Sequence, residues 1–225
     1  MTKLTMKVLV IGAHGKTGLR VVRRLREGGH DPLAMIRTPE QRKVFDELGV
    51  STVLGDLEYP IDHAVRGCDA VIFAAGSGSK TGKDKTVLVD HLGAIRSMVA
   101  AAMNGAKRYV MLSSFRSGTN SDSPIKHYNR AKGRADEFLR TMHEVMEDAL
   151  DWTIVCPGGL TEDEATEQVS VSLVTGVEPE GSSKTSRENL AAVLVASLDQ
   201  PATVGKTFTL FEGDTPIREA LRSLG

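Results

Sequence analysis

Three polar residues have the types and the spacing that a proton-transfer site needs: Ser114, Tyr128 and Lys132. On a helix, Tyr128 and Lys132 would lie one turn apart on the same face. A lysine ammonium beside a phenol favours the phenolate, so we expect Lys132 to lower the pKa of Tyr128. The hydroxyl of Ser114 could hold a carbonyl or alcohol oxygen of a substrate. Together the three groups suit proton transfer coupled to hydride transfer.

Tyr/Lys pairs at this spacing also occur on solvated helix surfaces, so the interpretation depends on the surrounding elements. Short apolar runs alternate along the chain with longer segments of helical periodicity. We expect strands at residues 7–11, 33–36, 51–54, 70–74, 109–112, 152–155, 169–175 and 207–211. We expect helices at residues 16–27, 39–48, 85–104, 130–149, 186–198 and 216–224. This order predicts an α/β fold with a doubly wound parallel sheet, a Rossmann fold formed as a single domain by residues 1–225.

Ligands of such sheets bind at the carboxyl ends of the strands, so the residues after each strand matter most. The first expected strand ends in a GxxGxxG pattern over residues 12–18, directly before a helix. Glycines there allow a tight turn and a close approach of the backbone to a pyrophosphate, which the helix N-terminus would attract. The spacing does not match a P-loop. The predicted phosphate-binding residues are Gly12, His14, Gly15, Lys16, Thr17 and Gly18.

The end of the second strand carries Arg37, whereas an NAD site usually has an acidic residue there. A guanidinium can hold a 2′-phosphate through two hydrogen bonds. We therefore expect NADP(H) as the preferred cofactor, with NAD(H) as the alternative. A solvated Arg37 is the competing interpretation, and Lys16, Arg42 or Lys43 could serve instead.

The third and fourth expected strands end in further candidates for the same site. Asp56 could accept a hydrogen bond from the adenine amine, although an Asp here is equally suited to cap a turn. The fourth strand ends in small residues that would let the backbone pass close to the nicotinamide ribose. These small residues are Ala74, Ala75 and Gly76.

Composition argues against several other classes of protein. The 28 basic and 29 acidic residues give a net charge of −1, and aromatic residues make up 4% of the chain, so we expect neither nucleic acid nor membrane as a partner. The two cysteines form no metal-ligand motif, so we expect no metal and a cytoplasmic location. We expect residues 157–185 to roof a substrate site, with the acidic residues 162–164 as a solvated loop.

The motifs together resemble the short-chain dehydrogenase/reductase superfamily, in its atypical and extended branches (epimerase/dehydratase-like and NmrA-like proteins). The resemblance rests on GAHGKTG at 12–18, IRT at 36–38, GDL at 55–57, FAAG at 73–76, LSS at 112–114, YNRAK at 128–132 and CPGG at 156–159. It implies Ser114, Tyr128 and Lys132 as the catalytic residues, with Ser113 as the alternative serine. It also implies cofactor contacts from Leu57, Ser113, Lys132, Pro157 and Gly158.

Two positions depart from the pattern of many relatives: Cys156 replaces an Arg, and Asp90 stands where an Asn is common. The chain also lacks the larger substrate region of nucleotide-sugar epimerases. We therefore expect an NADP(H)-dependent oxidoreductase, or an epimerase/dehydratase-like enzyme, that acts on a small molecule as a monomer or homodimer. The alternatives are an NmrA-like redox sensor without turnover and a flavin or biliverdin reductase-like enzyme.

Overall fold

The computed structural model describes residues 5–78, 81–118, 124–146, 150–173 and 183–225. The strands are β1 (Lys7–Ile11), β2 (Asp31–Ile36), β3 (Ser51–Leu54), β4 (Ala70–Phe73), β5 (Arg108–Leu112), β6 (Asp151–Pro157), β7 (Gly159–Thr161), β8 (Gln168–Ser172), β9 (Lys184–Ser186), β10 (Lys206–Glu212) and β11 (Thr215–Pro216). The α-helices are α1 (Lys16–Glu27), α2 (Arg42–Glu47), α3 (Asp62–Val65), α4 (Lys83–Lys85), α5 (Ala94–Met103), α6 (Lys126–Val145), α7 (Arg187–Ala196) and α8 (Ile217–Arg222). A π-helix, η2 (Thr86–Gly93), joins α4 to α5, and short 3₁₀ turns occur at η1 (Pro39–Gln41), η3 (Ser197–Asp199) and η4 (Pro201–Thr203).

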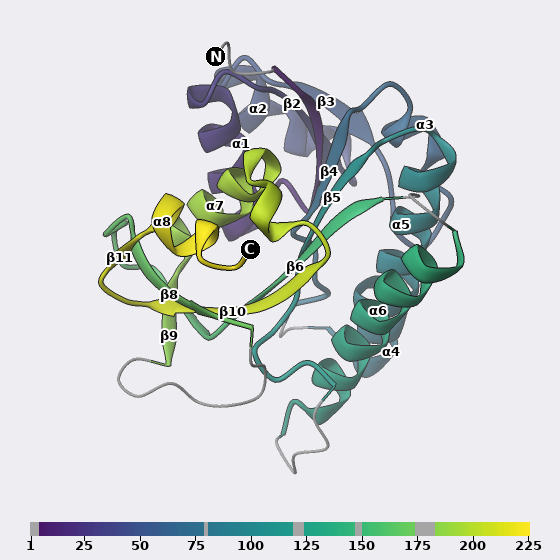
Figure 1. Cartoon of the computed structure of the whole chain (residues 1–225). Coiled ribbons are helices and arrows are strands. Elements are labelled where there is room, and N and C mark those ends of the chain that lie inside the picture. The colour runs from purple at the N-terminus through teal and green to yellow at the C-terminus, as the bar shows by residue number, and fades with distance from the viewer. Residues whose placement is uncertain (1–4, 79–80, 119–123, 147–149, 174–182) are drawn as a thin grey trace.

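The main sheet has the strand order β11-β8-β10-β6-β5-β4-β1-β2-β3, shown in Figure 1. All pairs from β10 to β3 are parallel, whereas β8 pairs antiparallel with both β10 and β11. Strands β1 to β3 are added toward one edge of the sheet and β4 to β6 toward the other, so the strand order switches between β1 and β4, the position where doubly wound sheets bind ligands. This confirms the predicted fold class, with an antiparallel edge added.

Helices cover both faces of the sheet, as the continuous apolar strands require. Alternate residues of each strand point to opposite faces, so Val8 and Val10 pack with α1, α2, α7 and α8. Leu9 and Ile11 pack with α3, α5 and α6 on the other face (Figure 1). The two clusters hold the strand ends in fixed register, and the site is built on those ends.

The structure changes some predicted boundaries. The helix expected at 130–149 begins at Lys126, so Tyr128 lies inside α6, while residues 147–149 lie outside the described residues. The helix expected at 85–104 is interrupted by the π-helical turns of η2. In the predicted roof, β7 and β9 form a separate two-stranded parallel sheet, and residues 174–182 are outside the described part.

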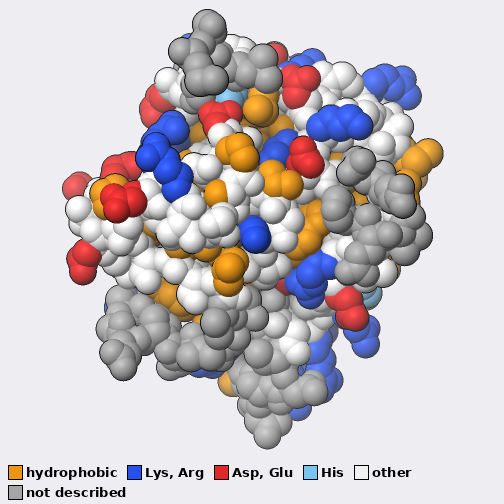
Figure 2. Space-filling model, viewed as in Figure 1, with side chains coloured by type: hydrophobic (Ala, Val, Ile, Leu, Met, Phe, Trp, Pro, Cys, Tyr) orange, Lys and Arg blue, Asp and Glu red, His pale blue; other side chains and the backbone are white. Residues whose placement is uncertain are grey.

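The segment Lys83–Met103 is long and apolar enough to cross a membrane by length and composition alone. In this fold one side of the segment packs inward, with Ala94 and Met98 fully buried against the sheet, while Val87, Val99 and Met103 are exposed. Figure 2 shows basic and acidic side chains interspersed over the visible face, with apolar side chains between them.

Candidate functional site: a dinucleotide cleft beside a buried lysine

The loop after β1 lies directly against the loop after β4. Gly12 has a φ of +83°, and a Cβ there would lie 2.6 Å from the Ala75 Cα. A Cβ on Gly18 would lie 2.1 Å from the carbonyl oxygen of Gly12, which accepts a hydrogen bond from the Gly15 amide at 3.0 Å. Any side chain at Gly12 or Gly18 would displace this turn. Within the described part of the chain no side chain caps the N-terminus of α1, so its first amides can face an anionic group.

A cleft of about 310 Å³ runs along the carboxyl ends of β1 to β4. Many predicted cofactor residues line it: Gly12, His14, Gly15, Arg37, Asp56, Leu57, Ala74, Ala75 and Gly76. The predicted residues Lys16, Thr17, Gly18, Ser113, Lys132, Pro157 and Gly158 do not line it. Lining residues that sequence reasoning missed are Met35, Gln41, Glu58, Thr81, Lys85 and Val89. Most of these belong to no motif, so only the folded chain shows them.

Charged groups in the cleft are partly paired with each other. Lys85 forms an ion pair with Glu58, and this hydrogen bond raises the pKa of Lys85. Asp56 accepts a hydrogen bond from the Glu58 amide at 3.0 Å, so it caps a turn, as one interpretation of the sequence expected, while also lining the cleft. Arg37 is exposed at the mouth, and no carboxylate of the described residues pairs with it. Arg37 therefore remains available to a phosphate.

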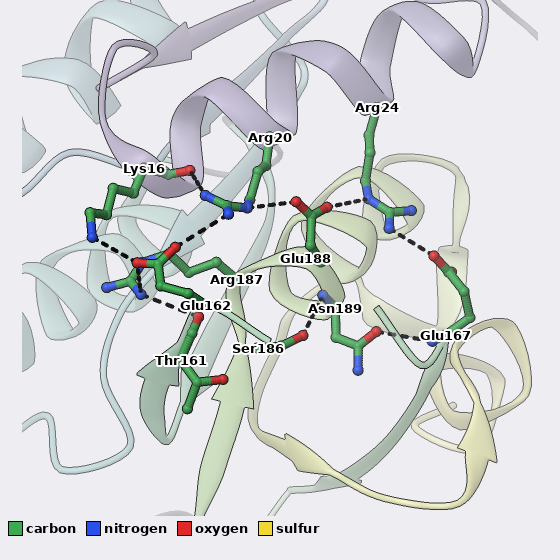
Figure 3. Close-up of polar contacts among 10 residues, drawn as sticks. All are labelled: Lys16, Arg20, Arg24, Thr161, Glu162, Glu167, Ser186, Arg187, Glu188 and Asn189. Carbon is green, nitrogen blue, oxygen red and sulfur yellow. Dashed lines mark hydrogen bonds and ion pairs between the residues drawn. The ribbon is translucent and has the colours of Figure 1, made fainter. Parts of the chain in front are cut away.

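Lys16 does not line the cleft, and its side chain is directed at Glu162 of the roof, as Figure 3 shows. The carboxylate of Glu162 binds Lys16 Nζ at 2.8 Å, Arg20 Nη2 at 3.2 Å and Arg187 Nη1 at 2.8 Å. These cations lower the pKa of Glu162, chiefly through the hydrogen bond from Lys16. Residues 162–164 are exposed and irregular, as expected of a solvated loop, and Glu162 in addition ties the roof to α1 and α7.

The two roof residues predicted to face the nicotinamide, Pro157 and Gly158, lie at the end of β6. The Gly158 amide donates to Thr185 Oγ1 and to the Leu210 carbonyl oxygen, each at 3.1 Å. A Cβ on Gly158 would lie 2.2 Å from the Ser183 carbonyl oxygen, so the roof packs directly on this glycine. The close approach of the Ser183 backbone thus explains why residue 158 is a glycine. A contact between Gly158 and a cofactor remains a prediction.

Tyr128 and Lys132 lie on one face of α6, next to the cleft. Lys132 is 1% exposed, and its Nζ donates to the carbonyl oxygens of Ala75 at 3.3 Å and Leu112 at 3.1 Å. The same Nζ lies 5.8 Å from the ring centre of Tyr128 and 3.7 Å from Oδ1 of Asp90. Since Ala75 also lines the cleft, Lys132 connects the Tyr128 region to the dinucleotide site.

The two serines after β5 have different surroundings. Ser113 is 3% exposed, and its hydroxyl donates to Oδ2 of Asp136 at 2.5 Å. Ser114 is half-buried, and its hydroxyl has no hydrogen-bond partner among the described residues. Ser113 is therefore committed to the interior, which leaves Ser114 as the serine that could hold a substrate oxygen.

The pKa of Tyr128 is raised, not lowered as the sequence interpretation expected. Burial of the phenol is the largest cause, and the opposing effect of the Lys132 ammonium is smaller. Asp90 and Asp136 add to the rise, because each disfavours a second negative charge nearby. Tyr128 is therefore a protonated phenol at neutral pH, and it is placed to act as a proton donor.

Asp136 is a candidate that the sequence analysis did not name, and Asp90 was noted there only as a departure from the family pattern. Asp136 is 1% exposed, and burial raises its pKa. Tyr128, Lys132 and Asp136 follow one another at intervals of four residues, a spacing that could have placed all three on one face of α6. In the described residues no group of three or more His, Cys, Asp or Glu side chains is arranged to hold a metal.

Comparison with known proteins agrees with this geometry. Residues 12–201 match a family model described as NAD(P)H-binding. The uncharacterized sugar epimerase YhfK of Bacillus subtilis is 40% identical over 97% of this chain and 100% of its own length. A Bacillus halodurans structure assigned as an NAD-dependent epimerase/dehydratase is 39% identical with a TM-score of 0.88, covering 97% of this chain and 99% of its own. The oxidoreductase ylbE from Lactococcus lactis is 28% identical with a TM-score of 0.81, covering 97% and 96%.

The match covers most of the chain and includes the glycine cradle and the Tyr128–Lys132 pair. It also agrees with the strand order, since the segment β3-β2-β1-β4-β5-β6 is the arrangement of dinucleotide-binding sheets. The chain belongs to the NAD(P)H-binding family, which confirms its resemblance to the short-chain dehydrogenase/reductase superfamily.

Proposed function

We propose that this chain is an NADP(H)-dependent oxidoreductase that reduces a carbonyl group of a small molecule. One observation carries the proposal: Lys132 Nζ binds the carbonyl oxygen of Ala75, a residue of the dinucleotide cleft, while it lies against the Tyr128 ring. A proton donor and a hydride-donor site are thereby brought to the same strand ends.

The glycine cradle and the cleft fit a dinucleotide, because Gly12 and Gly15 bring backbone without a side chain to the cleft where the pyrophosphate would lie. Gly12 and Gly15 with the N-terminus of α1 would hold the pyrophosphate, and Arg37 would hold a 2′-phosphate. Asp56 and Leu57 would border the adenine, whereas Ala74 to Gly76 would border the nicotinamide ribose. When bound, the reduced nicotinamide supplies the hydride.

The protein supplies the proton and the orientation. The Ser114 hydroxyl donates a hydrogen bond to the substrate carbonyl oxygen, and the Tyr128 phenol gives that oxygen its proton as the carbonyl carbon receives the hydride. The products are an alcohol and the oxidised cofactor, so one hydride and one proton balance the reduction. The Lys132 ammonium stabilises the Tyr128 phenolate until solvent returns the proton.

Replacement of Tyr128 tests the mechanism. We expect Tyr128→Phe to reduce kcat by at least about 100-fold, because it removes the acid, with no change in NADPH affinity. Turnover is followed by NADPH absorbance over a panel of aldehydes and ketones, and affinity by NADPH fluorescence. Tyr59→Phe, at an exposed tyrosine, is the matched control. Undiminished turnover in Tyr128→Phe would reject the mechanism.

The cofactor preference is tested separately at Arg37. We expect Arg37→Ala to weaken NADPH binding by about 10- to 100-fold and to leave NADH binding nearly unchanged, since a charge-assisted bond to the 2′-phosphate is lost. Arg66→Ala, which changes an exposed arginine outside the cleft, is the control. Equal loss of NADPH and NADH affinity would assign Arg37 to a role other than 2′-phosphate recognition.

A second candidate, epimerisation, is supported by the sugar epimerase and epimerase/dehydratase assignments of two similar proteins. An epimerase returns the hydride to its substrate, so the same Tyr128 and Lys132 would act without net consumption of cofactor. Oxidation of NADPH in step with alcohol formation selects the reductase. Interconversion of two sugar epimers in deuterated water, without net cofactor consumption and without deuterium at the epimerised carbon, selects the epimerase.

A further inference from the structure

A second hollow lies along α6 and is separate from the dinucleotide cleft. It has a volume of about 370 Å³, and its lining residues are Ser117, Gly118, Arg130, Gly133, Arg134, Glu137, Arg140 and Thr207. As far as the described residues show, it shares no lining residue with the dinucleotide cleft. We call this hollow the arginine groove. Its volume falls within the roughly 300–1,000 Å³ that is typical of small-molecule sites.

The lining of the arginine groove is polar throughout. Of the residues that the structure places there, three are arginines, one is a glutamate, and the rest are serine, threonine or glycine, without an apolar side chain. Three positive charges and one negative charge give the lining a net charge of +2, in a chain whose net charge is −1. Guanidinium groups bind phosphate and carboxylate oxygens through paired hydrogen bonds. The groove therefore favours an anionic ligand over an apolar or a cationic one.

Two arginines of the groove are held in different ways. Arg140 is half-buried, and its Nη1 donates to Thr207 Oγ1 at 3.4 Å, which fixes this side chain beside β10. Arg134 is exposed, and no hydrogen bond or ion pair among the described residues engages its guanidinium. Within the same part of the chain, neither arginine forms an ion pair with Glu137. The donors of Arg134 are therefore available to a ligand, and Arg140 supplies a second cation in a fixed position.

One wall of the groove is the loop after β5, which packs on α6 without a side chain in between. A Cβ on Gly133 would lie 2.4 Å from both the Cα and the amide nitrogen of Gly118. Gly118 has a φ of +75°, which favours glycine, and its amide donates to the Asn129 carbonyl oxygen at 2.9 Å. The two glycines thus hold the loop against the helix, so the groove is formed before any ligand binds.

The arginines of the groove are spread along α6. At about 1.5 Å per residue, positions 130 and 134 are about 6 Å apart along the helix axis, and positions 134 and 140 are about 9 Å apart. One phosphate or carboxylate group spans only part of this row. A molecule with two or more such groups matches the row better.

We propose that the arginine groove is a binding site for a small molecule that carries two or more phosphate or carboxylate groups. Arg134 and Arg140 bind the anionic groups of this molecule. The site goes beyond the proposed function and does not depend on the reaction at Tyr128. The Ser117 amide donates to the Ser114 carbonyl oxygen at 2.9 Å, so a ligand in the groove contacts the turn that carries the proposed substrate-binding serine.

Titration calorimetry with pyrophosphate at low ionic strength tests the site, since salt screens exposed charges. Saturating NADPH is present throughout, so that the dinucleotide cleft is occupied. We expect pyrophosphate to bind the original protein and Arg134→Gln to weaken this binding by about 5- to 10-fold, because charge-assisted hydrogen bonds are lost. Glu137→Gln should strengthen the binding, because it removes a negative charge from the lining. Arg66→Gln, at an exposed arginine that lines neither site, is the control.

The same titration with citrate distinguishes the two classes of ligand, because the anion that binds more tightly identifies the groove as a phosphate site or a carboxylate site. Circular dichroism checks that Arg134→Gln, a change at an exposed residue, leaves the fold intact. Failure of both anions to bind in the presence of NADPH overturns the proposal, and so does equal affinity in Arg134→Gln and Arg66→Gln. If NADPH itself does not bind, the proposed cofactor is rejected, yet the difference between these two variants still decides whether the groove binds anions.

Discussion

The molecule has two sets of ion pairs that differ in burial. Around Lys132, the side chains of Lys132 and Asp90 are 2% and 0% exposed. Around Glu162, the paired side chains of Lys16 and Glu162 are 70% and 48% exposed. Both sets connect elements that are distant in the sequence, α6 with η2 in the first case and α1 with the roof in the second (Figure 3).

The difference in burial distinguishes ion pairs that influence a reactive side chain from ion pairs that only attach one element to another. A buried pair loses its hydration, so its charges act strongly on a neighbour such as Tyr128 and are difficult to remove singly. An exposed pair is screened by water and salt, so it contributes little to stability. We therefore expect the Lys132 pair to govern reactivity and folding, and the Glu162 network to fix the roof only loosely.

The largest predicted effect is the loss of the buried cation. Lys132→Met should destabilise the fold by about 3–5 kcal/mol, because Asp90 remains buried without its compensating charge. The free energy of unfolding is measured by urea denaturation. Lys126→Met, at the exposed start of α6, is the control and should change stability little. A loss equal to that of the control would mean that the buried pair is not a stabilising unit.

The next prediction concerns pH and the second buried carboxylate. The folded protein raises the pKa of Asp136, so it holds this proton more firmly than the unfolded chain does. The stability that this protonation confers is complete below the unfolded pKa and is lost as pH rises through the folded pKa. Asp136→Asn has no such proton, so its stability relative to the original protein should increase between about pH 5 and about pH 8.

Urea denaturation at both pH values measures this difference. Glu137→Gln, at the exposed neighbouring residue, should show no comparable trend. If the stability of Asp136→Asn relative to the original protein stays constant with pH, Asp136 is ionised in the fold. The Ser113–Asp136 hydrogen bond would then join a hydroxyl to a carboxylate, and the assignment of Ser113 to the interior would still stand.

The sheet could be predicted from the sequence because the residues that identify each strand are consecutive in the chain. Continuous apolar runs such as Val8–Ile11 mark strands that are buried on both faces. The strands β7 and β9 are different: each has three residues, and among the described strands each pairs with the other alone, so no periodicity reveals them. The π-helix η2 was missed for a related reason, since an apolar helical pattern does not distinguish π from α geometry.

The candidate site also has features that local sequence patterns predict and features that depend on contacts between distant residues. The glycine cradle and the Tyr128–Lys132 spacing are local patterns, and the structure brings both to the strand ends. The Lys16–Glu162 pair joins residues 146 positions apart, so no local sequence pattern predicts it. The direction of the Tyr128 pKa shift was also beyond the sequence, because spacing shows the lysine but not the burial that outweighs it.

The smallest predicted effect belongs to the exposed network. Glu162→Gln removes the carboxylate shared by Lys16, Arg20 and Arg187. The loss in free energy of unfolding, measured by urea denaturation, should be much smaller than for Lys132→Met and should vanish at about 0.5 M salt. Because Glu162 has a lowered pKa in the fold, its contribution should be present at neutral pH and disappear as pH falls through that pKa. Glu164→Gln, at an exposed carboxylate without an ion pair among the described residues, is the matched control. A salt-independent loss as large as that of Lys132→Met would show that exposure does not separate the two sets of charges.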